Sequence, residues 1–255
     1  MAGRFVSPGI RSQDIFNDPD FLNVDHANYI IHEKRSHFAL WSSLSAPLII
    51  SAYMPASTAK EIEYVTNTDI IIAVDQEPLG NQAALISQDG TWDVLTKDLD
   101  GGDRLLTVLN RGNSTGSYTV PFSRIGISSS QVPYRLKDLW TGHESHVSNE
   151  ITAAPVPPHG TAVFRLSSLN TPTEIIPTGI IFNTYSLNCL TPSGKGSASW
   201  APCDASDAQV WQTPDDETVR SFLDTFQCLT DGGSQGSITV TFCNQWHRQQ
   251  SWSTR

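Results

Sequence analysis

The stretch FNDPDFLNVDHANYIIHEKRSHFALWSSLSAPLIISAYM, residues 16–54, predicts two successive strand-helix units. Residues 17–24 are expected to form a strand end and a loop. Apolar residues recur every three to four positions from 29 to 45, which is the spacing of an amphipathic helix. Residues 46–53 are a continuous apolar run that suits a strand buried on both faces of a parallel sheet. The apolar positions of the helix are Ile30, Ile31, Phe38, Trp41 and Leu44.

A second helix is predicted to begin at Thr58, because Thr58 and Glu61 have the spacing of a capping box. The order of strand, helix, strand and helix is the repeating unit of an α/β barrel or a doubly wound sheet. Two such units cannot close a barrel of eight. We therefore expect residues 1–81 to hold only part of a (β/α)8 barrel.

The middle of the chain, residues 82–170, is predicted to be an antiparallel β-sandwich. Apolar and polar residues alternate in 91–96 and 104–109, and the dipeptides Asp89-Gly90 and Gly101-Gly102 are hairpin signals. Further strands are expected at 118–122, 134–139 and 161–166.

The final segment, residues 171–255, contains an internal repeat. Its matching pairs, at offsets of 39 to 41 residues, are Cys189-Leu190 with Cys228-Leu229, Cys203 with Cys243, and Gln209-Val210-Trp211 with Gln250-Ser251-Trp252. A period near forty residues marks a supersecondary unit that stacks on its copy to build a core.

All four cysteines of the chain lie inside this repeat, at separations of 14 and 15 residues. Because the spacings repeat almost in register, we predict one disulfide per repeat, Cys189–Cys203 and Cys228–Cys243, in an oxidising compartment. Closing a loop of that size is worth about 3 kcal/mol in the chain-entropy model.

Several motifs of the first segment are similar to the seventh and eighth strand-helix units of family 27 α-galactosidases, especially their secreted fungal branch. They are NDPDFL from Asn17 to Leu22, HFALW from His37 to Trp41, APL from Ala46 to Leu48 and DQEPLG from Asp75 to Gly80. The family text has Trp before NDPD, Met for Phe21 and Asn-Gln-Asp at 75–77. The phrases KDLWTG at 137–142 and HGTA at 159–162 resemble the β-domain that follows the barrel in this family, where its role is structural.

The resemblance implies a retaining glycosidase that releases terminal α-galactose and needs no cofactor or metal. Such an enzyme requires two carboxylates about 5 Å apart. In the family these aspartates lie after the fourth and sixth strands, upstream of the NDPD motif, where this chain has only residues 1–12 before the match. Residues 1–12 also lack the apolar core of a signal peptide. We therefore expect a fragment, or a gene model started late, that is inactive alone, with the full-length protein secreted.

Asp20 matches the second aspartate of the family's NDPD motif, which implies that it lines the galactose pocket at the carboxyl end of the seventh strand. The alternative is that Asp18 and Asp20 are turn residues on either side of Pro19.

The tail resembles a ricin-type β-trefoil with two of its three repeats, so Trp211 and Trp252 are expected in its core. Sugar sites of that family have Asp directly after Cys-Leu, where this chain has Thr191 and Thr230. We expect any sugar affinity to be weak and to belong to Asp231 and Asn244 of the second repeat. A purely structural role of both repeats is the alternative.

Two other motifs have simpler interpretations. His32 and His37 nearly form an H-E-x-x-H zinc motif, but the extra residue between them turns them off one helix face, so solvated or capping histidines are the better interpretation. Residues 112–116 fit G-x-S-x-G, yet a strand follows instead of a helix, which predicts a hairpin turn. Asn113 in this turn begins a glycosylation sequon. The alternative is that this tripeptide occurs there by chance.

Composition agrees with a secreted globular protein. The formal charge is −10 without a cluster of Lys or Arg, so nucleic acid and anionic membranes are poor partners, and no apolar stretch reaches 18 residues. Two classes of function remain. One is the carboxyl-terminal part of an α-galactosidase acting on oligosaccharides or galactomannan side chains, and the other is a non-catalytic carbohydrate-binding or inert fragment.

Overall fold

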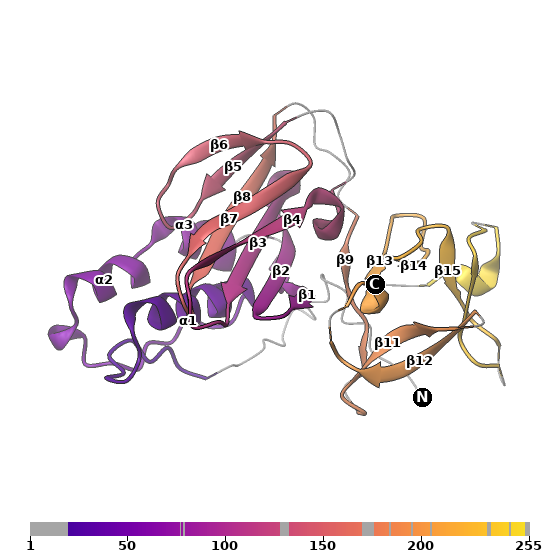
Figure 1. Ribbon diagram of the computed structural model, residues 1–255, viewed down its shortest axis with the longest axis horizontal. Helices are drawn as coiled ribbons and strands as arrows, with labels where there is room; N and C mark the ends of the chain where they lie inside the picture. Colours follow the sequence, from indigo (N-terminus) through magenta and orange to yellow (C-terminus); the bar gives the residue numbers. More distant parts are fainter. Residues whose placement is uncertain are drawn as a thin grey trace.

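The computed structural model describes residues 20–76, 78, 80–127, 133–169, 176–183, 185–194, 196–204, 206–233, 236–244 and 246–252. Three clusters of buried apolar side chains follow one another along the long axis of the molecule. They lie between helices and a sheet, inside a sandwich, and inside the tail. Figure 1 shows the helices at one end, the sandwich in the centre and the tail at the other end.

The helical end begins with α1 (Ile31–Ser43) and α2 (Ala59–Val65). A short helix α3 (Thr68–Ile70) continues into the π-helical turn η2 (Ile71–Asp75), and η1 (Met54–Ala56) precedes α2. The predicted capping box of α2 is confirmed, because Glu61 N donates to Thr58 Oγ1 at 3.3 Å and Thr58 N donates to Glu61 Oε2 at 2.7 Å.

The prediction of a strand buried on both faces at 46–53 is wrong. The structure has one parallel bridge, between Leu22 and Ile50, in which Leu22 N donates to Ile49 O at 2.8 Å and Ser51 N donates to Leu22 O at 2.9 Å. Ile49 is 50% exposed and Ile50 is 40% exposed. An apolar strand is buried only where neighbouring strands and helices cover it. Leu48 and Ala52 pack against the helical cluster, but the described residues leave Ile49 and Ile50 open to solvent. Residues 17–19 of the expected strand end lie outside the described residues.

The prediction of an apolar buried face on α1 is also only partly right. Phe38 and Ala39 are buried, but so are Lys34, Ser36, Ser42 and Ser43, whereas Ile30 is exposed. The elements that cover α1 present polar partners as well as apolar ones. Lys34 forms an ion pair with Glu61 of α2, and Ser43 Oγ lies 3.0 Å from Thr107 Oγ1 of the sheet.

The sandwich was predicted from alternation, and its antiparallel strands are confirmed. Its larger sheet has the order β1-β2-β3-β8-β5-β6, and β4 pairs with β7 in a second sheet. The bounds are β1 Ala84–Asp89, β2 Trp92–Leu99, β3 Asp103–Asn110, β4 Gly116–Pro121, β5 Tyr134–Asp138, β6 Glu144–Val147, β7 Glu150–Val156 and β8 Thr161–Ser168. The single turns η3 (Asp100–Gly102) and η4 (Phe122–Ile125) follow β2 and β4.

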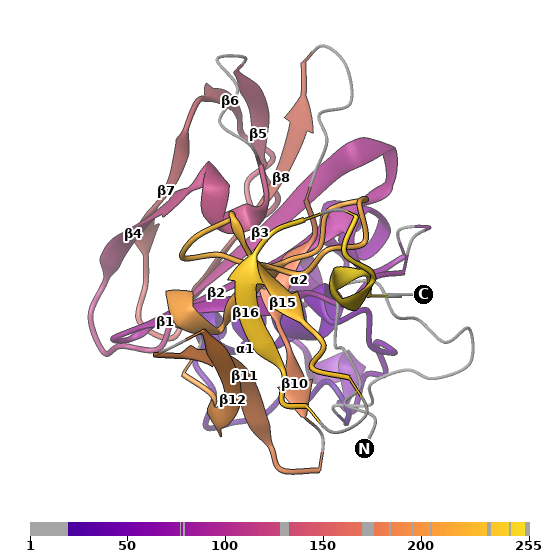
Figure 2. The same ribbon diagram turned by 90° about the vertical axis from the view of Figure 1, so that its right-hand side faces the viewer.

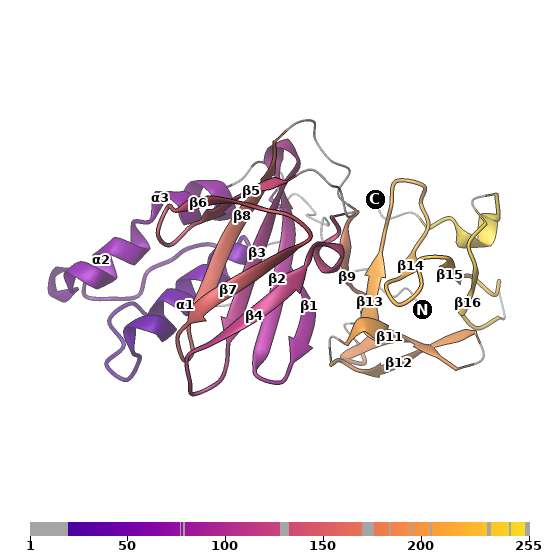
Figure 3. The same ribbon diagram turned by 45° about the horizontal axis from the view of Figure 1, so that its top comes forward.

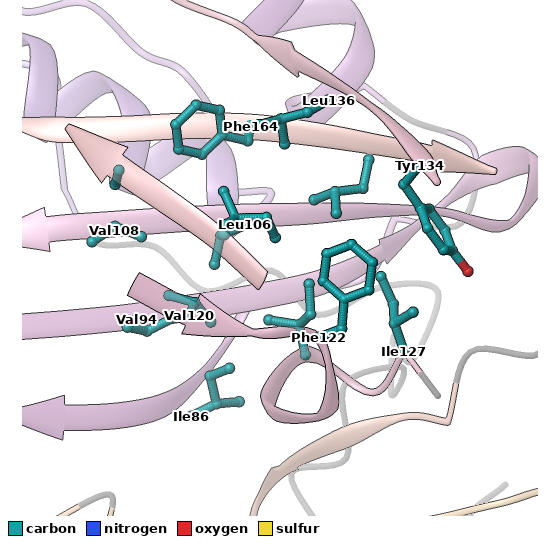
Figure 4. Close-up of a cluster of buried hydrophobic side chains, with 14 of the residues drawn as sticks. Ile86, Val94, Leu106, Val108, Val120, Phe122, Ile127, Tyr134, Leu136 and Phe164 are labelled. Carbon is teal, nitrogen blue, oxygen red and sulfur yellow. The ribbon is translucent and has the colours of Figure 1, made fainter. Parts of the chain in front are cut away.

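Both faces of the larger sheet are covered. Leu106 and Val108 of β3 point into the sandwich core, which Figure 4 shows filled from both sheets, while Leu105, the residue before Leu106, packs with the helices. This follows from the period of two in a strand. Figure 2 shows the resulting layers, with β4 and β7 on one side of the larger sheet and α2 on the other.

The turn at 112–116 is not a hairpin, contrary to the prediction. β3 pairs with β2 and β8, whereas β4 pairs with β7, so this turn passes from one sheet to the other. The hairpin signals Asp89-Gly90 and Gly101-Gly102 do join neighbouring strands, β1 with β2 and β2 with β3.

The tail is a strongly curved sheet with the order β10-β11-β12-β16-β15-β14-β13-β9. Figure 3 shows it beside the sandwich, beyond β9. The bounds are β9 Thr178–Ile180, β10 Phe182–Asn183, β11 Asn188–Ser193, β12 Ser197–Pro202, β13 Val210–Gln212, β14 Arg220–Ser221, β15 Gln227–Thr230 and β16 Thr239–Phe242, with turns η5 Asp207–Gln209 and η6 Arg248–Gln250.

Candidate functional site

Asp20 lies at the start of the described chain, two residues before the bridge residue Leu22. Its side chain is exposed, and its φ of 79° is the left-handed conformation that Asp tolerates better than most residues. Asp20 Oδ1 accepts a hydrogen bond from Phe21 N at 2.8 Å, and Asp20 O accepts one from Trp41 Nε1 of α1 at 2.8 Å. The helix therefore holds the backbone on which this carboxylate is presented.

Six large apolar side chains between residues 21 and 53 are exposed. We call them the barrel-edge surface, and they are Phe21, Tyr29, Ile30, Ile49, Ile50 and Tyr53. Two contacts join residues 22–25 to residues 50–53, namely the Leu22–Ile50 bridge and Tyr53 N donating to Asp25 Oδ2 at 2.9 Å. His26 stacks on Tyr29 at 4.1 Å within the loop before α1. Tyr53 is 69% exposed. A parallel pair with such residues beside it fits the edge of a larger sheet.

The two tail repeats use the same hydrogen bonds. Trp211 Nε1 donates to Leu190 O at 2.9 Å, and Trp252 Nε1 donates to Leu229 O at 2.9 Å. Trp211 belongs to the buried core of the tail and Trp252 packs against it. The expected core role of both tryptophans agrees with this geometry.

The glutamine of each repeat donates a hydrogen bond to the threonine that follows Cys-Leu. Gln209 Nε2 donates to Thr191 Oγ1 at 3.1 Å, and Gln250 Nε2 donates to Thr230 Oγ1 at 2.9 Å. Both hydroxyls thus receive a hydrogen bond from within their own repeat.

The structure contains the two disulfides that the cysteine spacing predicts, Cys189–Cys203 and Cys228–Cys243. Each joins a strand, β11 or β15, to the residue that directly follows the neighbouring strand, β12 or β16, with Cα–Cα distances of 5.0 and 4.9 Å. These distances lie within the ordinary range for a bridge.

Asp231 and Asn244, the expected sugar-binding pair, are both exposed. Asp231 Oδ1 accepts from Gly233 N at 3.0 Å, and Asn244 Oδ1 accepts from Trp246 N at 3.1 Å, so each carboxylate or amide oxygen shapes a turn. Asn244 borders a surface hollow of about 410 Å³, whereas Asp231 is not among its lining residues. The hollow is lined by Asp216, Thr218, Arg220, Phe242, Cys243, Asn244 and Trp246.

Sequence reasoning missed most of this hollow. Asp216 and Arg220 precede the second repeat motif, and their proximity to Trp246 depends on how β14, β15 and β16 pair. One signal was present in the sequence. Trp246 follows Cys243 closely, and the first repeat has Ser206 at the corresponding place.

The two histidines of α1 serve different surroundings. His37 packs edge-on against Trp41 at 4.0 Å, and burial lowers the pKa of His37 below its ordinary value. His32 instead lines a small cavity with Arg35 and Trp140, where the Arg35 guanidinium lies 4.3 Å from the Trp140 ring centre. Within the part of the chain that the structure describes, no three His, Cys, Asp or Glu side chains form a possible metal site.

Asn113 is exposed in the turn between the two sheets, and its Oδ1 lies 3.1 Å from His159 Nε2. Its position on the surface leaves room for a glycan. Among the described residues, no helix is both long and apolar enough to cross a bilayer.

Comparison with known proteins defines the class of the sandwich. Residues 89–166 match the family model of the α-galactosidase C-terminal β-sandwich domain. The fold of α-galactosidase I from Mortierella vinacea is similar, with a TM-score of 0.58 and 26% identity, covering 62% of this chain and 41% of that one.

The similarity to α-galactosidases extends over most of the chain. α-Galactosidase A of Aspergillus niger is 44% identical over 234 residues, which are 92% of this chain and 42% of that protein. A probable α-galactosidase A from a second Aspergillus niger strain is 42% identical over 254 residues, 99% of this chain and 46% of that protein, so this match includes the tail. The chain spans less than half the length of the curated relatives it matches.

Proposed function

We propose that this chain is the carboxyl-terminal part of a secreted α-galactosidase, a retaining glycosidase that releases terminal α-galactose from oligosaccharides and galactomannan. The observation that carries the proposal is the 42–44% identity to fungal α-galactosidases over 92–99% of the chain. The barrel-edge surface supports it, because exposed isoleucines beside a parallel bridge fit the packing of further barrel strands and helices.

In this proposal residues 1–81 complete the barrel, residues 82–170 form the β-sandwich and residues 171–255 form two repeats of a ricin-type trefoil. In support of that division, the sandwich and the tail each have an apolar core of their own, and a third cluster joins the helices to the outer face of the larger sheet. Asp20 binds a galactose hydroxyl, because it is an exposed carboxylate whose backbone is fixed by Trp41. The nucleophile and the acid/base come from barrel strands that this polypeptide does not provide.

The chemistry explains why these 255 residues alone are expected to be inactive. A retaining glycosidase forms and breaks a covalent bond to the anomeric carbon, which takes a nucleophilic carboxylate and a proton donor on opposite sides of the sugar. Asp20 can position a hydroxyl, but a single carboxylate cannot perform both steps. The polypeptide alone should therefore not hydrolyse an aryl α-galactoside above background.

A chimera tests the proposal. The part of Aspergillus niger α-galactosidase A that this chain does not match would be fused to this chain, and hydrolysis of an aryl α-galactoside would be measured. We expect activity with retention of configuration, and we expect Asp20→Asn to lower kcat/KM about 100-fold, since it removes a hydrogen bond to a charged partner. Asp100→Asn, at an exposed turn of the sandwich, is the matched control and should change kcat/KM far less. A folded but inactive chimera would contradict the proposal.

Secretion is part of the same proposal. Two disulfides in the tail favour an oxidising compartment, and Asn113 is proposed to carry a glycan in the exposed turn. Expression in a fungal secretory host should give material whose mass falls on treatment with a peptide N-glycosidase. Asn113→Gln should abolish that change, and an unchanged glycan in this variant would show another site.

The second candidate function is a non-catalytic carbohydrate-binding module. The hollow beside Asn244 favours it, because it is open, aromatic and charged. In this function the second repeat binds sugar weakly through Asn244, with the carboxylate supplied either by Asp231, as the sequence predicts, or by Asp216 of the hollow, while the first repeat is structural. Binding without hydrolysis by the isolated polypeptide is the expected result.

A further inference from the structure

We propose that the hollow beside the second disulfide binds a pyranose ring, with Trp246 as the stacking surface and Asp216 and Arg220 as partners of adjacent hydroxyls. Asn244 is shared with the site expected from the sequence, but Asp231 lies outside it. The choice of galactose as the probe rests on the proposed function.

The aromatic wall of the hollow is exposed. Trp246 is 84% exposed and Phe242 is 70% exposed, while Phe226 stacks on Phe242 with the two rings within 4° of parallel. One face of a pyranose consists of C–H groups, and burying that face against an indole removes apolar surface of both from water. Large rings left this open on a small domain mark a binding surface.

The polar wall is held in place before any ligand arrives. Asp216 Oδ1 accepts from Thr218 Oγ1 at 2.6 Å and from Thr218 N at 3.1 Å. Arg220 pairs with Asp216 and donates from Nε to Thr218 Oγ1 at 2.9 Å, and Thr218 is buried. A carboxylate acceptor and a guanidinium donor side by side suit two neighbouring hydroxyls, each of which can donate and accept.

Electrostatic interactions keep the Asp216 carboxylate ionised, so that it can accept hydrogen bonds. Burial by itself would raise the pKa of Asp216, but hydrogen bonds from Thr218 and the charge of Arg220 lower the pKa below its ordinary value. Asp216 is therefore ionised at neutral and mildly acidic pH. Its geometry, a charged pair that lines the same hollow as an exposed indole, is what fits a sugar.

The first repeat provides a comparison within the same molecule. Asp204 makes the same turn as Asn244, because Ser206 N donates to Asp204 Oδ1 at 2.9 Å as Trp246 N does to Asn244 Oδ1. That repeat has Ser206 where the second has Trp246, and Pro202 where the second has Phe242. The backbone is repeated but the aromatic wall is not, so the wall is not a requirement of the repeat fold.

The test uses the complete 255-residue polypeptide, labelled with ¹⁵N and titrated with methyl α-galactoside. The chain has seven tryptophans, so their indole N–H signals can be resolved, and the one lost in Trp246→Phe belongs to Trp246. We expect the Trp246 signal to shift with the sugar. The chemical shifts of the Trp211 and Trp252 indole N–H signals should not change, since these groups are hydrogen-bonded to Leu190 O and Leu229 O.

Matched variants locate the site. Trp246→Ala and Asp216→Asn should each lower the affinity about tenfold, and Trp246→Phe should lower it about threefold, because it retains a smaller ring. Asp215→Asn, the same change one residue away, and Asp231→Ala should each alter the affinity less than about twofold. Thermal unfolding of each variant checks that the fold is kept.

Three results would overturn the proposal, namely no shift at any sugar concentration up to saturation of the solution, affinity unchanged by Trp246→Ala, or affinity lost with Asp231→Ala while Asp216→Asn retains it. An inactive chimera would not bear on this result, because the indole shift reports binding by the tail without catalysis.

Discussion

Arg124 of the sandwich forms an ion pair with Asp207 of the tail, joining the two parts of the molecule. The same guanidinium lies 4.7 Å from the ring centre of Phe222, which also belongs to the tail. Close by, Ile176 N donates to Gly126 O at 3.0 Å. A Cβ on Gly126 would lie 2.1 Å from Ile176 O, so the two backbones are in direct contact. One arginine thus adds two side-chain contacts where the backbones already touch.

Replacing Arg124 by Ala should loosen the tail from the sandwich. We expect a loss of about 1–2 kcal/mol, because a half-exposed ion pair and a cation–π contact each contribute about 0.5–1 kcal/mol. Scanning calorimetry should then show the tail unfolding before the sandwich. Arg111→Ala is the control, because Arg111 forms its ion pair, at 2.9 Å, with Asp93 of the same sandwich domain and does not contact the tail through it. Equal effects of the two variants on the tail would argue against coupling through Arg124.

The tail core should depend on Trp211 more than on Trp252. Trp211 is 1% exposed, so Trp211→Phe leaves Leu190 O without its hydrogen bond in a buried place, at a cost of about 1–3 kcal/mol. Trp252 is only partly buried, so water can replace the lost donor to Leu229 O and the cost should be smaller. Denaturant unfolding of the two variants measures the difference. A larger loss of unfolding free energy for Trp252→Phe than for Trp211→Phe would show that the second repeat contributes more to the stability of the tail.

Peptide mapping without reduction should recover the pairs Cys189–Cys203 and Cys228–Cys243 from secreted material. Reducing both bridges should lower the free energy of unfolding of the tail by about 3 kcal/mol for each, because the open loops regain conformational freedom when unfolded. Replacing one pair by Ala at a time separates the two contributions. Linkage between the repeats, or free thiols, would refute the repeat assignment.

Acid should weaken the contact between α1 and α2. Hydrogen bonds from Lys34 and Thr58 lower the pKa of Glu61 from 4.5 to about 2. A carboxylate with a depressed folded-state pKa stabilises the fold above its unfolded pKa, and that stabilisation is lost as pH falls from about 4.5 to about 2. Each pKa unit corresponds to about 1.4 kcal/mol, and screening by solvent beside the ion pair brings the expected loss to about 1–2 kcal/mol.

The free energy of unfolding measured between pH 2 and pH 6 checks this expectation. Glu61→Gln should reduce the pH dependence in this window, because the amide does not titrate. Glu63→Gln, a neighbour on the same helix, is the control and should leave the slope nearly unchanged. An equal slope in wild type and Glu61→Gln would mean that another carboxylate causes the acid sensitivity.

Features that depend on a few neighbouring residues were open to prediction from the sequence. The capping box of Thr58 and Glu61 needs only residues three positions apart. The strands of the sandwich follow from a period of two, and the cysteine pairs follow from a repeat whose two copies bond their glutamines and tryptophans in the same way. In each case the residues that determine the feature lie within one element, or the same motif occurs in both repeats.

The tertiary structure decided what each of these elements touches. Ile49 and Ile50 belong to an apolar run, yet they are exposed, because burial requires other elements to cover them. The buried side of α1 carries Lys34 because α2 brings Glu61 to it, and no periodicity in α1 contains that partner. The hollow arises in the same way, since Asp216 and Trp246 are thirty residues apart and meet only through the pairing of β14, β15 and β16. A sequence pattern shows which residues one segment contains. Only the tertiary structure determines which other segments pack against those residues.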